Sequence, residues 1–247
     1  MLSKADIKYI NSLQNKKYRK IEHAFLVEGY KNVQEVLDSD YEVEKVFCAA
    51  SYFEQFSENA KAKKTQIEII SERDLAQLGT LETNHSAIAI VKTKELESLP
   101  NFRAQELIIA LDGVNDPGNL GTIIRIADWY GIKNIVCSNE TVDIYNPKVI
   151  NATKGSFTRV NVHYAELEVY LKSISGIPIL AACMSGKSVY KLDNVLPSVL
   201  LMGNEANGIK ENLLNLVTNE ISIPRIGGAE SLNVGVATGI IVDRLLN

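Results

Sequence analysis

Apolar and polar positions alternate with two different periods over the first 95 residues. Short segments that are mostly apolar, or apolar at every second position, predict β-strands. The segments between them have helical spacing, and one of these begins at Ser71, with capping spacing to Asp74, and ends at Gly79. The predicted strands are 24–29, 41–49, 66–70 and 86–93, and the predicted helices are 30–39, 51–64 and 71–79. This alternation predicts a small α/β domain.

A second alternating series begins at residue 106. Strands such as 107–111 and 199–202 are apolar throughout, which is typical of a parallel sheet that helices cover on both faces. The predicted strands are 106–111, 134–138, 159–162, 178–183, 199–203 and 220–224, and the predicted helices are 119–131, 147–153, 167–174, 210–216 and 232–246. We therefore predict an α/β fold whose second domain is a mostly parallel sheet with helices on both faces.

Residues 93–104 separate the two series. They are charged, contain Pro100 and show no periodicity, so they are predicted to form a linker. A chain of 247 residues is long enough for two domains. The predicted domains are therefore 1–95 and 104–247.

Composition narrows the class of protein. Apolar residues make up 46% of the chain and charged residues 23%, which excludes disordered, collagen-like and low-complexity chains. The three cysteines and three histidines are scattered without metal-ligand spacing, so no metal site is predicted. The chain shows neither a secretory signal nor an apolar segment of membrane-spanning length. These features predict a cytoplasmic protein with no membrane and no metal partner.

Charge is distributed unevenly. The net charge is −4, which argues against a protein that grips nucleic acid over its whole surface. Residues 1–20 nevertheless hold six basic side chains against one acid, Asp6. The pattern fits a phosphate-contacting surface and equally a solvated first helix.

The loop after strand 106–111 is rich in residues that shape a helix start. Asn119 is placed to cap the following helix, and Gly121 and Arg125 share one helix face. An arginine beside a glycine-opened helix start suits an anion such as a phosphate. Taken alone, the same pattern fits an ordinary surface arginine.

Two further loops follow predicted strands. In the first, Gly203 and Gly208 bracket Asn204 and Glu205, so backbone groups can approach a ligand while side chains supply directed hydrogen bonds. The second runs from Pro224 to a helix rich in small residues. Those small residues are Gly235, Ala237 and Gly239.

Other ligand and catalytic motifs fail on spacing. The segment 185–190 contains Gly-Lys-Ser, but the glycine that a phosphate-binding loop requires five residues before Gly186 is replaced by Ala181. No Gly-x-Gly-x-x-Gly follows a strand, and no Ser-His-Asp arrangement is placed for a hydrolase.

The three loops together resemble the SpoU/TrmH family of S-adenosylmethionine-dependent RNA ribose 2′-O-methyltransferases, within the SPOUT superfamily. The family motifs N-x-G-x-x-x-R, G-N-E-x-x-G and I-P…S-L-N-V occur in this order. They are matched by Asn119, Gly121 and Arg125; by Gly203, Asn204, Glu205 and Gly208; and by Ile223, Pro224, Ser231, Leu232, Asn233 and Val234. Residues 16–37 also resemble the family's ribosomal-protein-like substrate-binding domain. Gly235, where the family often has Ser, and the segment 152–156 depart from the family pattern.

The resemblance implies a fold, a cofactor and residue roles. The second domain is expected to be a trefoil knot that binds S-adenosylmethionine through Gly203, Asn204, Gly208, Ile223, Pro224 and Leu232. The expected catalytic residues are Arg125, Asn119, Glu205, Ser231 and Asn233. A guanidinium is almost always protonated, so Arg125 is expected to stabilise a developing oxyanion or fix a phosphate rather than act as a base. The expected RNA-binding residues are Lys16, Lys17, Arg19, Lys20 and Lys154.

The resemblance also implies partners. Ribosomal RNA, with the large subunit favoured, is the expected substrate ahead of transfer RNA, and a homodimer is expected through the closing helix. That helix could instead pack inside one subunit. Two alternatives stay open at this point: a transfer-RNA 2′-O-methyltransferase, and a noncatalytic RNA-binding assembly factor with the same fold.

Overall fold

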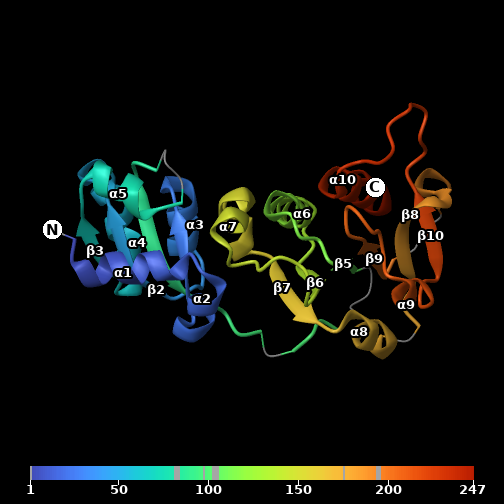
Figure 1. Cartoon of the computed structure of the whole chain (residues 1–247), viewed down its shortest axis with the longest axis horizontal. Helices are drawn as coiled ribbons and strands as arrows, with labels where there is room; N and C mark the ends of the chain where they lie inside the picture. Colours follow the sequence, from blue (N-terminus) through green and yellow to red (C-terminus); the bar gives the residue numbers. More distant parts are fainter. Residues whose placement is uncertain (1, 81–83, 97, 102–105, 175, 193–195) are drawn as a thin grey trace. The chain divides into compact units, whose positions relative to one another are not determined.

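The computed structural model describes residues 2–80, 84–96, 98–101, 106–174, 176–192 and 196–247 (Figure 1). The chain forms two compact units. The first comprises 1–95 together with 143–158, and the second comprises 96–142 and 159–247. The predicted linker 93–104 lies partly outside the described residues, as does the predicted boundary at 104.

The first unit is built around a four-stranded mixed sheet in the order β1-β4-β2-β3. β1 and β2 run antiparallel to β4, whereas β3 runs parallel to β2. All predicted strands and helices of this region are present. The elements are α1 (Lys4–Leu13), α2 (Lys16–Glu22), β1 (Ala24–Glu28), α3 (Tyr30–Asp38), β2 (Val43–Cys48), η1 (Ala50–Tyr52), α4 (Phe53–Lys63), β3 (Gln66–Ile69), α5 (Glu72–Leu78) and β4 (Ala87–Lys92), with α7 (Pro147–Thr153) and η2 (Ser156–Thr158) from the later segment.

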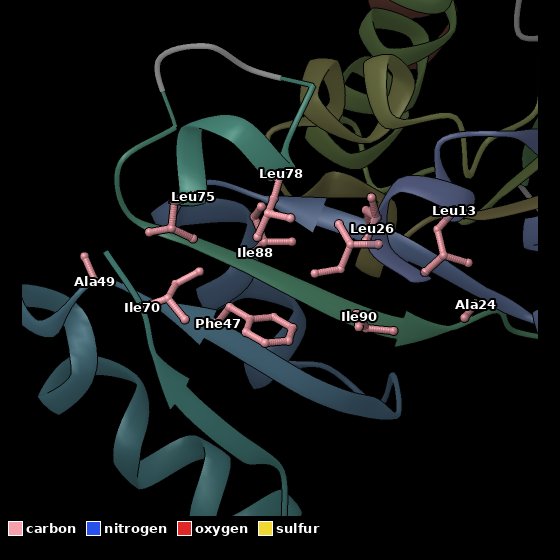
Figure 2. Packing of buried hydrophobic residues seen from close by; sticks show 11 residues of the cluster. Leu13, Ala24, Leu26, Phe47, Ala49, Ile70, Leu75, Leu78, Ile88 and Ile90 are labelled. Atoms are coloured by element: carbon pink, nitrogen blue, oxygen red, sulfur yellow. The ribbon is translucent and has the colours of Figure 1, made fainter. Parts of the chain in front are cut away.

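One face of this sheet packs against α1 and α5. Alternate strand residues such as Leu26, Phe47 and Ile88 point to the same side, where Leu13 and Leu75 meet them (Figure 2). Each of these five side chains is completely buried. At about 25 cal/mol for each Å² of apolar surface, such burial is the main stabilising contribution to the unit.

The opposite side of β1 is covered by the segment 143–158. Phe25 lies 4.4 Å from the Tyr145 ring and 6.0 Å from Phe157, and Tyr41 completes the cluster at 5.6 Å from Phe157. The hydroxyl of Tyr145 accepts a hydrogen bond from the backbone N of Lys94 at 2.9 Å. Residues that belong by sequence to the second domain therefore complete the core of the first unit.

The second unit is a six-stranded sheet in the order β10-β8-β9-β5-β6-β7, and every neighbouring pair is parallel. The predicted α/β class with a mostly parallel sheet is confirmed. The elements are β5 (Leu107–Leu111), α6 (Pro117–Trp129), β6 (Asn134–Ser138), β7 (Asn161–Ala165), α8 (Leu167–Ser173), β8 (Ile179–Ser188), η3 (Val189–Lys191), β9 (Ser198–Met202), α9 (Glu211–Leu214), β10 (Asn219–Ser222) and α10 (Val234–Leu246).

Helices flank this sheet, which explains its uninterrupted apolar strands. Ile108 and Ala110 of β5 pack in a cluster with α8 and α9, through residues such as Leu171 and Leu213. The alternate residues of β5 are buried as well. Within the described part of the chain, no helix is long and apolar enough to cross a membrane.

The edge of the sheet differs from the prediction. β8 extends to Ser188 rather than ending at 183. Glu220 of β10 pairs with Ala181 of β8, but the next residue of β10 pairs with Lys187, so the register shifts and the later part of β8 also belongs to the sheet. A side chain at Gly186 would lie 2.5 Å from the backbone of Glu220, so only glycine fits there. The Gly-Lys-Ser segment is therefore part of a strand. The strand predicted at 159–162 is displaced to Asn161–Ala165.

The two glycines of α10 face α6 of the same chain. A side chain at Gly235 would lie 3.0 Å from Cγ2 of Thr122, and one at Gly239 would lie 3.4 Å from Cδ1 of Ile126. Close helix packing within one subunit therefore accounts for both glycines, and an intersubunit face is not needed to explain them.

Arg19 is the buried side chain of α2. Its Nη2 lies 2.7 Å from Oδ2 of Asp143, and its Nη1 donates to the carbonyl oxygens of Leu13 and Gln14 at 3.0 and 2.8 Å. The guanidinium thus joins the end of α1 to the segment 143–158. Arg19 does not belong to an exposed basic surface, which corrects its expected contact with RNA.

Arg19→Ala is expected to destabilise the first unit by about 3 kcal/mol, because it leaves Asp143 and two carbonyls without their donor in a buried setting. Urea unfolding followed by circular dichroism measures the change. The matched control is Lys17→Ala on the same helix, where the exposed side chain predicts a change within about 0.5 kcal/mol. Equal effects of the two substitutions would contradict this account.

Candidate active site

The motif residues lie on loops that leave carboxyl ends of the parallel strands. The segment after β5 leads into α6, the segment 203–210 joins β9 to α9, and the segment 223–233 joins β10 to α10. In parallel α/β sheets this edge is where ligands bind. The structure therefore brings loops separated by about half the chain to one edge of one sheet.

Gly113 connects the loops at this edge. Its backbone N donates to Oγ of Ser138 at 3.0 Å, and its carbonyl oxygen accepts from Nδ2 of Asn204 at 2.6 Å. Its φ of +69° is in the left-handed region, which favours glycine at this position. The turn after β5 is thereby fixed to its neighbours on both sides.

The segment 203–208 is a tight turn held by its own backbone. Asn204 and Gly208 exchange two N–H···O bonds of 2.9 Å each. The side-chain oxygen of Asn204 also accepts from the backbone N of Ala206 at 2.9 Å. A side chain at Gly203 would lie 2.6 Å from the backbone N of Ile209, so glycine is required where the turn folds back.

Three predicted catalytic residues form a chain of hydrogen bonds. Nδ2 of Asn233 donates to Oδ1 of Asn119 at 2.7 Å, and Nδ2 of Asn119 donates to Oε1 of Glu205 at 2.7 Å. The three residues are separated by up to 114 positions in the sequence. This network joins the starts of α6 and α10 to the turn after β9.

The role predicted for Asn119 as a helix cap was wrong. Asp116 is the N-cap of α6, and its Oδ1 accepts from the backbone N of Asn119 at 2.8 Å. Pro117 occupies the first turn, where its missing N–H costs nothing. Since Asp116 supplies the cap, the Asn119 amide is available for the network. Asn233 does cap a helix, because its Oδ1 accepts from the backbone N of Gly235 at 2.9 Å.

Arg125 lies on the outer surface of α6. It is exposed and makes no hydrogen bond or ion pair with any residue that the structure describes. Gly121, one turn earlier, is buried. A charged guanidinium without an internal partner can bind an incoming anion.

The remaining predicted site residues have different exposures. Pro224 and Ser231 are exposed, and half of Leu232 is accessible, whereas Ile223 is partly covered. No hydrogen bond joins Ser231 to the Asn233–Asn119–Glu205 network among the bonds of the described residues. The long segment 223–233 thus presents most of its motif residues to solvent.

The predicted RNA-binding residues other than Arg19 are exposed. Lys16, Lys17 and Lys20 lie on α2, and Lys154 is the left-handed C-cap of α7 with φ of +53°. All of them belong to the first unit.

Sequence reasoning missed polar residues that follow the strands directly. Asp112 is almost completely buried, and its Oδ2 accepts from the backbone N of Lys210 at 2.9 Å. Nζ of Lys210 donates to Oε1 of Glu140 at 2.9 Å, and this bond is the main cause that lowers the pKa of Glu140 and raises the pKa of Lys210. An acid immediately after a wholly apolar strand was the signal that could have identified Asp112.

No metal centre is formed by the described residues, since they contain no group of three or more His, Cys, Asp or Glu side chains placed to hold an ion. Burial raises the pKa of the Cys137 thiol and lowers the pKa of His163. Both shifts favour the neutral form of the side chain.

Comparison with protein families gives two matches. The sequence model of the SpoU rRNA Methylase family matches residues 106–243, which contain all three motif loops. The chain belongs to the SpoU rRNA methylase family. Residues 4–89 match a second family, the MRM3-like substrate binding domain.

Relatives of the family share both parts of the chain. The 23S rRNA (guanosine(2553)-2′-O)-methyltransferase RlmP of Bacillus subtilis is 29% identical over 242 residues, which cover 97% of this chain and 95% of the relative. A solved structure from Porphyromonas gingivalis, assigned to the TrmH family of RNA methyltransferases, is 32% identical, with a TM-score of 0.83 over 99% of this chain and 98% of that one. An AdoMet-bound rRNA methyltransferase structure from Sinorhizobium meliloti is 28% identical, with a TM-score of 0.87 over 99% and 96% of the two chains.

Gly203→Ala is expected to destabilise the turn after β9, because the new methyl group would meet the backbone of Gly208 and Ile209. We expect a loss of about 2 kcal/mol or more and faster hydrogen exchange at the Asn204 and Gly208 amides. The control is Gly227→Ala, where the added methyl group meets open space. Retained amide protection in Gly203→Ala would show that the turn tolerates a side chain.

Proposed function

We propose that this SpoU-family protein is an S-adenosylmethionine-dependent methyltransferase that modifies a ribose 2′-hydroxyl in RNA. The observation that carries the proposal is the Asn233–Asn119–Glu205 network. It assembles one residue from each motif loop beside a helix whose Arg125 has no partner among the described residues. A purely structural edge of a sheet does not need three polar side chains joined in this way.

The residues present fit the cofactor. In the turn 203–208 the side-chain oxygen of Asn204 accepts a hydrogen bond from the backbone of Ala206. An added Cβ atom at Gly208, Gly227 or Gly228 would meet no other atom within 4 Å, so the space beside these glycines is open. Glycines with open space beside them let a nucleoside approach the backbone closely. We assign cofactor binding to Gly203, Asn204, Gly208, Ile223, Pro224 and Leu232.

When bound, S-adenosylmethionine supplies an activated methyl group on a sulfonium sulfur. The protein has to hold the ribose oxygen in line with that group, and positioning of this kind can supply most of the rate enhancement. As the new C–O bond forms, the bond between the methyl carbon and the sulfur would break to leave S-adenosylhomocysteine, and the 2′-hydroxyl would release its proton to the surrounding water. Arg125 stabilises the negative charge that develops on this oxygen, or fixes the adjacent phosphate, and remains protonated throughout.

The network residues orient the reacting groups. Asn119 receives a hydrogen bond on its oxygen and donates one from its nitrogen, so its amide is fixed in one orientation. Glu205 is exposed and accepts the Asn119 bond with one carboxylate oxygen, which leaves acceptor capacity for a substrate hydroxyl. Ser231 and Asn233 complete the floor of the site.

We assign RNA binding to the first domain, residues 1–95, and catalysis to residues 104–247. The family matches at 4–89 and 106–243 support this division. Lys16, Lys17 and Lys20 supply exposed cations on α2, and Lys154 supplies another in the first unit. Ribosomal RNA is the favoured substrate, because the full-length similarity to RlmP includes the substrate-binding domain.

The proposal includes a knot, a dimer and a cytoplasmic location. The knot follows from the family resemblance, and α10, which comes after the edge strand β10, packs on α6, the helix between β5 and β6. Trp129 of α6 and Val236 of α10 are 86% and 51% exposed, and large apolar side chains of this kind favour burial in a second copy of the chain. A cytoplasmic location gives the enzyme access to its RNA.

Ribose-methylation mapping of total RNA from cells with and without the gene tests the activity. We expect one 2′-O-methyl signal to disappear and to return on complementation, and its position identifies the substrate. A position in transfer RNA would overturn the ribosomal assignment. No change at any site, together with RNA binding by the purified protein, would favour a noncatalytic assembly factor.

Arg125→Ala is expected to lower methyl transfer by about 100-fold or more, because the charge developing on the 2′-oxygen loses its stabilising cation. S-adenosylhomocysteine binding, measured by calorimetry, is expected to stay within about twofold of the unchanged protein. Lys133→Ala, which removes another exposed cation of the second unit, controls for net charge. Loss of cofactor binding in Arg125→Ala would contradict the role assigned to Arg125.

A further inference from the structure

A buried carboxylate at the carboxyl end of β5 has no role in the function described so far. Asp112 follows β5 directly and is 1% exposed. Its Oδ2 accepts from the backbone N of Lys210 at 2.9 Å, whereas its Oδ1 has no hydrogen-bond partner among the described residues. An ionised carboxylate removed from water is costly unless a positive group compensates it.

The compensating group is the side chain of Lys210. Its Nζ lies 3.6 Å from Oδ1 of Asp112 and 2.9 Å from Oε1 of Glu140. The Lys210 side chain is half exposed and that of Glu140 is 59% exposed, so Asp112 alone is the buried member of the cluster. The pKa of Lys210 is raised, chiefly by its hydrogen bond to Glu140, which keeps the ammonium charged beside Asp112.

This cluster of Asp112, Lys210 and Glu140 lies at the end of the loop after β9. The loop begins at Gly203, and Asn204 is tied near its start to the carbonyl oxygen of Gly113 by a bond of 2.6 Å. It finishes at Lys210, which is the N-cap of α9 and has no side-chain cap bond of its own. The two neighbouring residues Asp112 and Gly113 therefore hold both ends of the loop, one through a carboxylate and one through a backbone carbonyl.

We propose that Asp112 and Lys210 are positioning residues for cofactor binding. The ion pair fixes the exit of the loop 203–210 and thereby presets the backbone groups of Gly203 and Gly208, to which the proposed function assigns S-adenosylmethionine. The inference rests on that function. Asp112 and Lys210 act through the loop and need not touch the reacting atoms.

Lys210→Met tests the proposal, because it removes the ammonium, keeps the length of the side chain and leaves the buried Asp112 carboxyl without its cationic partner. We expect the dissociation constant for S-adenosylhomocysteine to rise at least about tenfold in calorimetry. The KM for S-adenosylmethionine is expected to rise in parallel, while kcat at saturating cofactor and KM for RNA stay within about twofold. Partial unfolding would instead reduce the binding stoichiometry and kcat.

The double variant Asp112→Asn/Lys210→Met makes the pair neutral. The amide oxygen introduced at position 112 can still accept from the backbone N of residue 210, so we expect the double variant to bind S-adenosylhomocysteine at least about threefold more tightly than Lys210→Met. If Lys210→Met does not fold, the double variant carries the test: because it lacks the ion pair, it is expected to bind S-adenosylhomocysteine about three- to tenfold more weakly than the unchanged protein, and unchanged affinity would overturn the positioning role.

The matched control is Lys172→Met, which breaks an exposed pair with Glu168 in the same unit and uncovers no buried carboxylate. It is expected to leave cofactor affinity unchanged within about twofold. Unchanged affinity in Lys210→Met, or a double variant that binds no more tightly than it, overturns the positioning role. Failure of the unchanged protein to bind S-adenosylhomocysteine would instead overturn the proposed function, so the two failures are distinguishable.

Discussion

The two-residue step that follows β5 is the constraint on which the proposed active site depends. The backbone of Asp112 continues the sheet by donating to the carbonyl oxygen of Met202, and Gly113 then turns through a left-handed conformation. From that turn, bonds reach the end of β6 through Ser138 and the loop after β9 through Asn204. Each bond contributes only about 1 kcal/mol, but the bonds come from consecutive peptide groups and therefore all require the same backbone conformation at Asp112 and Gly113.

The direction of the hydrogen bonds explains why amides occupy two positions of the network. Asn233 accepts backbone bonds at the start of α10 with its oxygen and donates to Asn119 with its nitrogen. Asn119 in turn accepts on its oxygen and donates to Glu205. A carboxylate at either position could only accept, and it would also place a second negative charge close to Glu205. The chain of donors therefore ends on the carboxylate of Glu205, which accepts from Asn119.

Much of the fold could be predicted from the pattern of apolar positions. The wholly apolar strands at 107–111 and 199–202 correctly indicated a covered parallel sheet, because polar alternation in a strand buried on both faces would place polar side chains in the core. The motif spacing also identified Asn119, Glu205 and Asn233, which the fold brings into one network. Local spacing does not reveal the partner of a side chain, however.

The errors arose where long-range packing decides the role of a residue. Arg19 lies among exposed lysines in a uniformly basic segment, yet its side chain pairs with Asp143, which lies 124 positions away. Asn119 and Asp116 are both good capping residues, but Asp116 caps α6, whereas the Asn119 amide bonds to Glu205, which lies 86 positions away. Gly235 and Gly239 indicated close packing correctly, but the partner they pack against is α6.

The placement of residues 143–158 has a consequence for the modular history of the chain. The first unit takes Tyr145 and Phe157 into its aromatic core, so a gene fragment that ends near residue 96 would encode an incomplete unit with Phe25 uncovered. The chain passes between the two units three times, at 95, 142 and 158. A substrate-binding module could not therefore be exchanged by a single recombination at the linker without also matching the segment 143–158.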